Sequence, residues 1–311
     1  MQEMFEKLPE KFYVTNVQVA TIWTNPQAAR AEDQDGITNP TDILKWVNSL
    51  TYEQGLALCN ENLVQSQTLY GEPVIVLGEE EGWAHVIAPF QPSKKDARGY
   101  PGYIPIRQLT PVTKEAWLQD RYSVVITDDA RLEAPEKETN MPLSYLTILP
   151  YSGESHTHVY VQTPAGRQQI VKEKTVTVAK ETGLTPGSGT DIVNAGLPFI
   201  GLAYFWGGMS SFGYDCSGLA YAVHKANGYW IARDAGDQAA AGKEVSIDAI
   251  EPGDLLFFAY QEGKGDIHHV GIYKGDGEML HSPQTGKGIE ITPLKATKYE
   301  KELCAARRYW R

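Results

Sequence analysis

The chain has 311 residues, of which 42% are hydrophobic and 22% charged, so it is long enough for two or three globular domains. Its formal net charge of −11 disfavours nucleic acid and anionic membranes as partners, because both would repel the surface. No apolar stretch reaches the ~18 residues of a membrane-spanning helix, and the first residues lack the basic and apolar regions of a signal peptide.

The first part of the chain, residues 13–110, combines short strands with one helical stretch. "FYVTNVQVATIW" predicts a strand, and "NPTDILKWVNSLTYEQGLALCNENL" predicts a helix capped by Asn39 or Thr41. "EPVIVLGEEEGWAHVIAP" predicts two strands around an acidic turn that ends in Gly82, and "GYPGYIPIRQLTPV" predicts a short closing strand. We expect a small all-β barrel with a helical insert.

The second part, residues 111–178, repeats this pattern without the helical insert. The segments "RYSVVITDDARLEAP", "PLSYLTILPYSGES", "HVYVQTPAGRQQIV" and "KTVTVAK" are short β runs separated by Asp, Gly and Pro. The similarity between "VIVLGEEEGWAHV" and "LTILPYSGESHTHVYV" indicates that the two parts are copies of one small barrel.

The third part, residues 180–311, places helices before strands. A helix is predicted from Asp191 as N-cap, and "CSGLAYAVHKANG" predicts another that ends at Gly228. "DLLFFAY", "HVGIYKGDGEMLHS" and "LCAARRYW" then predict an antiparallel sheet. Helices separated from a sheet in this way are typical of an α+β domain.

Cys216 lies at the predicted start of the second of these helices. Backbone N–H groups and the positive end of the helix dipole meet there, so we expect the pKa of this thiol to fall below its usual value of roughly 8.5. Ser217 and Gly218 keep the turn small enough for a substrate to reach the sulfur. The alternative is that Cys216 is a buried residue that packs the helix on the sheet. A nucleophile needs an imidazole within reach, so the choice depends on a histidine.

A hairpin is predicted to supply that histidine. "GDG" at 275–277 favours a tight turn, which would bring His269 and His281 near each other across an antiparallel pair. His269 is then the general base and His281 orients its ring through a hydrogen bond. Gly271, on the same face as His269, would leave room for the helix that carries Cys216. His268 is the alternative base.

Five motifs follow one another between residues 185 and 311: "YFWGGMSSFGYDCSG", "ARDAGDQ", "EPGDLLFF", "HHVGIY" and "MLHSP". In this order and spacing they resemble the NlpC/p60 family of bacterial cell-wall cysteine peptidases, which have a papain-like catalytic core. Residues 13–178 resemble two bacterial SH3-like domains. The whole arrangement is similar to YkfC-type γ-D-glutamyl-L-diamino acid endopeptidases. The resemblance thus implies an α+β papain-like domain, with helices packed on an antiparallel sheet, preceded by two small SH3-like barrels.

The resemblance also implies a set of site residues. It gives Cys216 as the nucleophile, His269 as the base and His281 as the third polar residue. Residues expected to contact the substrate are Tyr204, Trp206, Asp215, Ser217, Arg233, Asp234, His268, Glu61 and Tyr100. Tyr103 could take the place of Tyr100. In each case the alternative is a structural role, such as a core aromatic, a loop salt bridge or a solvated acid.

The activity implied is hydrolysis of the γ-D-glutamyl–L-diamino acid bond, with lysine or meso-diaminopimelate, in muropeptides that carry a free N-terminal L-alanine. Neither a metal nor a cofactor is expected, and we expect a monomer. The protein would be secreted or wall-associated if a signal peptide had been removed, and cytoplasmic otherwise. One alternative is a broader peptidoglycan hydrolase with wall-binding SH3-like domains. A second is a catalytically silent wall-binding protein, and a third is an acyltransferase of related fold.

Overall fold

The computed structural model describes residues 1–134 and 139–311. They divide into two compact units: unit 1 holds Met1–Phe90, Lys95–Gly183 and Ser210–Phe212, and unit 2 holds Gln91–Lys94, Leu184–Met209 and Gly213–Arg311. No helix among the described residues is long and apolar enough to cross a membrane.

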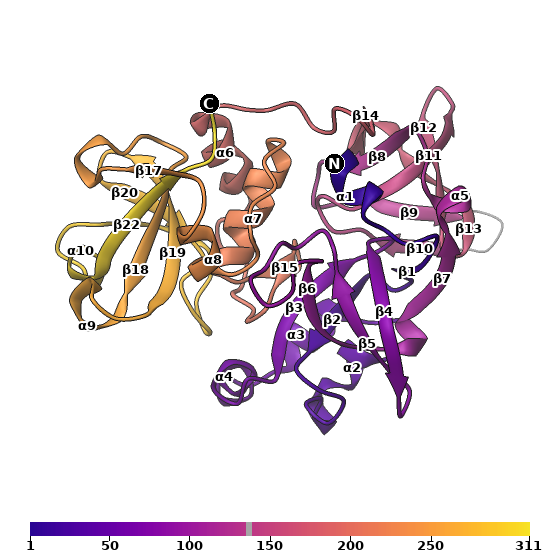
Figure 1. Cartoon of the computed structure of the whole chain (residues 1–311), viewed down its shortest axis with the longest axis horizontal. Coiled ribbons are helices and arrows are strands. Elements are labelled where there is room, and N and C mark those ends of the chain that lie inside the picture. The colour runs from indigo at the N-terminus through magenta and orange to yellow at the C-terminus, as the bar shows by residue number, and fades with distance from the viewer. Residues whose placement is uncertain (135–138) are drawn as a thin grey trace. The chain divides into compact units, whose positions relative to one another are not determined.

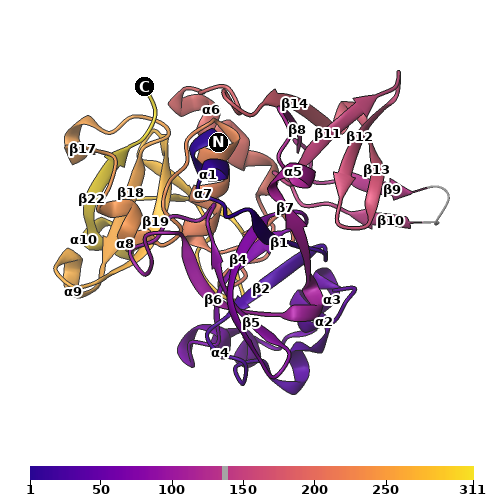
Figure 2. The ribbon, with the colours of Figure 1, turned by 45° about the vertical axis from the view of Figure 1, so that its right-hand side comes forward.

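Unit 1 contains two antiparallel sheets with the same topology. The first has the order β3-β2-β6-β5-β4-β1-β7 and the second the order β10-β9-β13-β12-β11-β8-β14, so each strand of the second sheet corresponds to the strand seven places earlier. Figures 1 and 2 show the second sheet from two directions. The predicted repeat is therefore confirmed. The predicted barrels are not, because among residues 1–134 and 139–311 the end strands of each order do not pair and both sheets stay open.

The strands of the first sheet are β1 (Lys11–Thr15), β2 (Val19–Trp23), β3 (Val64–Leu69), β4 (Pro73–Glu80), β5 (Trp83–Ala88), β6 (Tyr100–Pro105) and β7 (Leu109–Thr113). Those of the second are β8 (Arg121–Val125), β9 (Arg131–Ala134), β10 (Thr139–Pro142), β11 (Ile148–Glu154), β12 (His158–Thr163), β13 (Gly166–Val171) and β14 (Thr175–Ala179). Pro135, the last residue of one predicted β run, lies outside the described residues.

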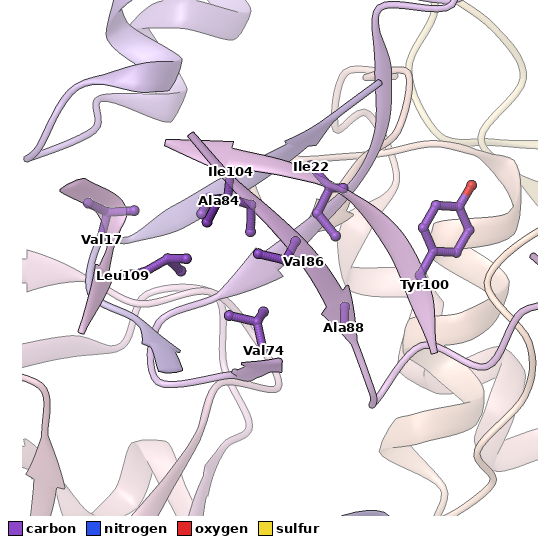
Figure 3. Close-up of a cluster of buried hydrophobic side chains, with 10 residues drawn as sticks. Val17, Ile22, Val74, Ala84, Val86, Ala88, Tyr100, Ile104 and Leu109 are labelled. Atoms are coloured by element: carbon purple, nitrogen blue, oxygen red, sulfur yellow. The ribbon is translucent and has the colours of Figure 1, made fainter. Parts of the chain in front are cut away.

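Inward-facing side chains of the first sheet form its core. They are Val17, Ala20, Ile22, Val74, Ala84, Val86, Ala88, Tyr100, Ile104 and Leu109, all buried (Figure 3). The predicted hairpin between β4 and β5 turns at Glu81 and Gly82, whose φ angles of 50° and 80° are those of a type I′ turn.

The helices of unit 1 include an insert between β2 and β3. The helical segments are α1 (Gln2–Glu6), the 3-10 turn η1 (Ala31–Asp33), α2 (Gln34–Ile37), α3 (Ile43–Ser49), α4 (Tyr52–Asn60), η2 (Ile106–Gln108), α5 (Lys114–Trp117) and η4 (Lys172–Lys174). The single helix predicted from Asn39 or Thr41 is wrong. Asp42 caps α3, Leu50 is extended, and Thr51 begins α4 with a capping box. Asn39 instead donates to Asn16 and to the carbonyl of Arg107.

Unit 2 is an α+β unit. Its helical segments are α6 (Gly189–Gly196), η5 (Leu197–Phe199), α7 (Cys216–Ala226), α8 (Ala235–Ala239), η6 (Ile247–Ala249), α9 (Tyr260–Gly263) and α10 (Lys298–Glu302). A short ribbon pairs β15 (Met209–Ser210) with β16 (Gly213–Tyr214). The main sheet has the order β17-β22-β18-β19-β20-β21 and consists of β17 (Lys243–Val245), β18 (Leu255–Ala259), β19 (Ile267–Gly275), β20 (Glu278–His281), β21 (Glu290–Pro293) and β22 (Leu303–Arg308).

Helices pack on this sheet through its alternating side chains. Helices α6 and α7 lie together against β19 (Figure 1), and a Cβ at Gly196 of α6 would lie 2.6 Å from Leu280 and 3.3 Å from Val223. Leu280 and its neighbour Met279 point to opposite faces of β20. Met279 packs with Phe258, among other residues, in a second buried cluster. The predicted N-cap Asp191 is wrong: Ser188 caps α6, and Asp191 completes the capping box.

Candidate active site

Helix α7 begins at Cys216 because Asp215 caps it. Oδ1 of Asp215 accepts from the backbone N–H of Gly218 (2.7 Å) and the hydroxyl of Ser217 (3.2 Å). The helix closes as predicted, since Gly228 follows the C-cap residue with a φ of 75°. Cys216 is therefore the first residue of an 11-residue helix.

A buried ion pair fixes this helix start. Nη2 of Arg233 lies 2.7 Å from Oδ2 of Asp215, and Nη1 of Arg233 donates to Oγ of Ser217 at 2.8 Å. Oδ2 also accepts from the backbone N–H of Gly207 at 2.9 Å. A carboxylate offers about four lone-pair positions, so these contacts use the hydrogen-bonding capacity of Asp215. These contacts hold the start of α7; contact of Asp215, Ser217 and Arg233 with substrate stays a prediction.

The thiol of Cys216 is half-buried. Burial, and next the carboxylate of Asp215, raise its pKa to about 12. The N–H groups of Val270 and Ser217 and the guanidinium of Arg233 oppose this rise. The predicted lowering of the pKa is thus wrong: the helix start favours the thiolate, but loss of water and a carboxylate next in sequence outweigh it.

The predicted hairpin brings the two histidines together. It turns at Asp276 and Gly277, both with positive φ, and Nε2 of His269 lies 2.8 Å from Nδ1 of His281. Both rings are buried. Gly271 has a different use from the one predicted, because a Cβ there would lie 2.5 Å from Sδ of Met279 and 3.5 Å from Cβ of His281. It makes room for the opposite strand rather than for α7.

The imidazole of His269 has a lowered pKa. Burial, and next the neighbouring His281, His268 and Lys298, hold its pKa well below 6.5. The ladder between β18 and β19 shifts register next to it, between Phe258 and Ala259. Such irregularities re-aim side chains near active sites. With Nε2 engaged by His281, Nδ1 is the nitrogen left for a reacting group.

Cys216 lies beside this histidine. Its sulfur accepts a hydrogen bond from the backbone N–H of Val270, the residue after His269. The ring of Tyr299 lies 5.5 Å from that of His269. Burial, and next the charges of Glu290, Glu302 and Cys216, raise the pKa of the Tyr299 phenol to about 12. The thiol therefore contacts the backbone of β19 at the residue next to His269.

Three further residues that the sequence did not single out line this site. Oγ1 of Thr292 is 2.9 Å from Nε2 of His281 and donates to Oε1 of Glu290 at 3.3 Å. The ring of Tyr299 lies 5.2 Å from that of His281. Only the i, i+2 spacing of "EIT" on a strand would have suggested that Glu290 and Thr292 share a face.

The other predicted contacts in unit 2 surround the helix start and the hairpin. Tyr204 forms an isolated β-bridge with Tyr214, the residue before Asp215. Trp206, two residues after Tyr204, is half-buried. Asp234 stands at the start of α8, 3.8 Å from Nη1 of Arg233. His268 stacks on Tyr260 at 4.1 Å and lies 3.3 Å from Oε2 of Glu302. The role of these residues in binding substrate stays a prediction.

The predicted contacts in unit 1 have ordinary local partners. Glu61 is exposed at the C-cap of α4. Tyr100 is buried, with Nζ of Lys95 4.2 Å above its ring, whereas Tyr103 is half-buried and stacks on His85. Tyr100 and Tyr103 are three residues apart on β6 and so face opposite sides of the strand. Both tyrosines and Glu61 remain candidates.

A thiol at a helix start, beside an imidazole that a second imidazole orients, defines a cysteine peptidase. The NlpC/P60 family model matches residues 201–308, and the YKFC SH3b2 domain model matches residues 125–178.

Full-length relatives agree with these matches. The chain is 47% identical to gamma-D-glutamyl-L-lysine dipeptidyl-peptidase of Bacillus subtilis (strain 168), over 93% of this chain and 96% of the relative. It is 36% identical to the Bacillus cereus protein of that name, over 98% and 92%. A crystal structure of an NlpC/P60 family protein from Bacillus cereus, 36% identical, superposes with a TM-score of 0.93 over 97% of this chain and 100% of the other. The chain belongs to the NlpC/P60 family.

Proposed function

We propose that this cysteine peptidase hydrolyses the bond between the γ-carboxyl group of D-glutamate and L-lysine, and so releases a dipeptide from muropeptides. The observation that carries the proposal is the contact of Cys216 with the backbone N–H of Val270, the residue next to the paired His269 and His281, in a chain whose full-length relatives bear the name of that activity. We also propose that α7 packed on the sheet is a papain-like arrangement, that both sheets of unit 1 are SH3-like, and that residues 13–110, 111–178 and 180–311 are the three domains.

The reaction begins with a neutral thiol and a neutral imidazole. Nδ1 of His269 takes the proton of Cys216 while the sulfur attacks the γ-carbonyl carbon of D-glutamate. The tetrahedral intermediate collapses when the imidazolium donates its proton to the lysine amine, which leaves. Water, deprotonated by the same imidazole, then cleaves the thioester and restores the thiol.

The start of α7 also offers a donor to the carbonyl oxygen. Cys216 is the first residue of the helix, where backbone N–H groups have no carbonyl partner within the helix. Its N–H stabilises the oxyanion as the tetrahedral intermediate forms. One such donor contributes roughly 3 kcal/mol in comparable sites. The ion pair of Asp215 and Arg233 supports this geometry by fixing the residue before the nucleophile.

The size of the preferred substrate follows from the charge on its N-terminus. A peptide with a free N-terminal L-alanine carries an ammonium group, and burying that group requires an acid as a partner. We propose Glu61 and Asp234 as the acids and Tyr100 or Tyr103 as the residue that covers the peptide. Stem peptides still attached to glycan lack this ammonium, so free turnover peptides are the preferred substrates over intact peptidoglycan.

The test is hydrolysis of L-Ala-γ-D-Glu-L-Lys, followed by mass spectrometry of the dipeptide and of free lysine. Wild type should release both, and Cys216→Ala should release neither. Cys304→Ala is the matched control, because Cys304 is an exposed cysteine on β22 of the same unit. Cleavage that persists in Cys216→Ala would exclude the mechanism. A wild type that cleaves only polymeric sacculi would favour a broader wall hydrolase.

A further inference from the structure

A chain of side chains leads from the proposed base to the solvent-facing side of β21. Nε2 of His269 meets Nδ1 of His281 (2.8 Å), Nε2 of His281 meets Oγ1 of Thr292 (2.9 Å), and Oγ1 of Thr292 donates to Oε1 of Glu290 (3.3 Å). The His281 side chain is fully buried, whereas that of Glu290 is 46% exposed. The family resemblance and the mechanism account for the two histidines but assign nothing to Thr292 or Glu290.

Both imidazoles are neutral at neutral pH. Burial, and next the cation of Lys298, lower the pKa of His281 to about 4. The pKa of His269 is lowered for similar reasons. A neutral imidazole has one N–H donor and one acceptor nitrogen. The chain of hydrogen bonds can therefore run in only two directions, and these place different protons on His269.

In the first direction, Nε2–H of His269 donates to His281, Nε2–H of His281 donates to Thr292, and the hydroxyl of Thr292 donates to Glu290. Every donor has an acceptor, and a carboxylate, which only accepts, ends the chain. Nδ1 of His269 then carries a lone pair, ready for the thiol proton of Cys216.

In the opposite direction, Nδ1–H of His281 donates to His269, and Nε2 of His281 must accept from Thr292. A hydroxyl has one proton, so Thr292 could not also donate to Glu290, and two acceptors would face each other. His269 would carry its proton on Nδ1, where it could not accept another. The contact with Glu290 thus disfavours the unproductive tautomer.

We propose that Thr292 and Glu290 are positioning residues that set the direction of this chain and thereby keep Nδ1 of His269 unprotonated. The inference rests on the proposed function, in which His269 is the base. It assigns a specific role to a hydroxyl and a carboxylate that act through His281.

The kinetic test compares Thr292→Val, which removes the hydroxyl at almost constant shape, with Thr292→Ser, which keeps it. Thr292→Val should lower kcat roughly tenfold, the effect expected for one lost hydrogen bond, with KM within about twofold of wild type. Thr292→Ser should restore kcat to within about threefold. Thr177→Val, the same change on β14 of unit 1, is the control. Equal kcat in wild type and Thr292→Val would overturn the proposal.

Glu290→Gln tests the end of the chain, because an amide can donate to Thr292 as well as accept. It should lower kcat, by less than Thr292→Val does. Glu278→Gln on β20, where the carboxylate pairs with Lys274, is the control. A Glu290→Gln enzyme with wild-type kcat would overturn the role given to Glu290.

Nitrogen-15 NMR of labelled histidines gives a readout that does not depend on activity. In wild type, His269 and His281 should both be protonated on Nε2, and Thr292→Val should shift both towards a mixture. A proton on Nδ1 of His269 in the wild-type protein would overturn the proposal, even if Thr292→Val proved too unstable to assay. If Cys216→Ala still hydrolysed substrate while the tautomers were as expected, the proposed function would fail and the hydrogen-bond assignment would stand.

Discussion

Asp215 and Arg233 form a buried ion pair, with 2.7 Å between Oδ2 and Nη2, directly before the residue that carries the thiol. Removing one partner of such a pair leaves an uncompensated buried charge. Arg233→Leu should therefore lower the free energy of unfolding by about 3–5 kcal/mol, measured by urea denaturation. Arg98→Leu, which breaks the exposed pair of Arg98 with Asp96, is the control and should cost far less, because solvent screens an exposed pair. Equal losses would contradict the buried-pair argument.

After burial, the same carboxylate is the next cause of the raised pKa of the Cys216 thiol. Since Asp215 is the second cause of the raised pKa of Cys216, Asp215→Asn should lower that pKa while it keeps a capping side chain. Alkylation of wild-type Cys216 by iodoacetamide should be slow at pH 6 and rise with pH, because the thiol is the resting form. The variant should react severalfold faster at pH 8. Peptide mapping of the alkylated protein gives the rate at Cys216 with Cys304 as internal reference, and fast alkylation of wild type at pH 6 would contradict the raised pKa.

The orienting contact between the histidines gives a third prediction. His281→Leu should lower kcat by roughly 10²-fold, because His269 loses the acceptor that holds its ring and its tautomer. His281→Asn should retain more activity, since an amide oxygen can still accept from Nε2. Steady-state kinetics with the free tripeptide would decide this. Equal activity of the Leu and Asn variants would show that His281 acts by filling space rather than by hydrogen bonding.

Short-range signals in the sequence were enough to predict the pieces of this site. The "GDG" turn predicts the hairpin and hence the meeting of His269 and His281, and "DCSG" before an apolar helix predicts where Cys216 lies. The repeated strand pattern likewise predicts two similar sheets. Each of these is decided by residues close in the chain, so local preferences of turns, caps and strands suffice.

The sequence could not predict quantities that depend on distant neighbours. The pKa of Cys216 is set by burial, which no local pattern reports. Thr292 contacts His281 only because β21 pairs with β20. The choice of helix cap also depends on distant residues. Asn39 does not cap a helix, because its side chain donates to Asn16 and to the carbonyl of Arg107 instead.

Buried histidines make the stability of unit 2 depend on pH. His224 on α7 is fully buried, and burial lowers its pKa from 6.5 to about 4. Between these values the unfolded state binds a proton that the folded state does not, so stability falls as pH falls from 6.5 towards 4. His224→Leu should reduce this dependence by about 1.4 kcal/mol per pH unit, measured by urea denaturation at several pH values. His158→Leu, at a half-buried position on β12, is the control. An unchanged slope in His224→Leu would contradict the prediction.

The last prediction concerns the preference of the enzyme for peptides with a free N-terminus. Glu61 lies at the exposed C-cap of α4, and its charge contributes to the raised pKa of Arg30. If its carboxylate pairs with the substrate ammonium, wild type should prefer L-Ala-γ-D-Glu-L-Lys to the N-acetylated peptide. Glu61→Gln should then lower kcat/KM for the free peptide roughly tenfold, about 1.4 kcal/mol, and leave the acetylated peptide unaffected. Glu53→Gln, an exposed acid on the same helix, should change neither rate. Equal losses on both peptides would indicate a structural effect, because only the free peptide carries the charge that Glu61 is proposed to recognise.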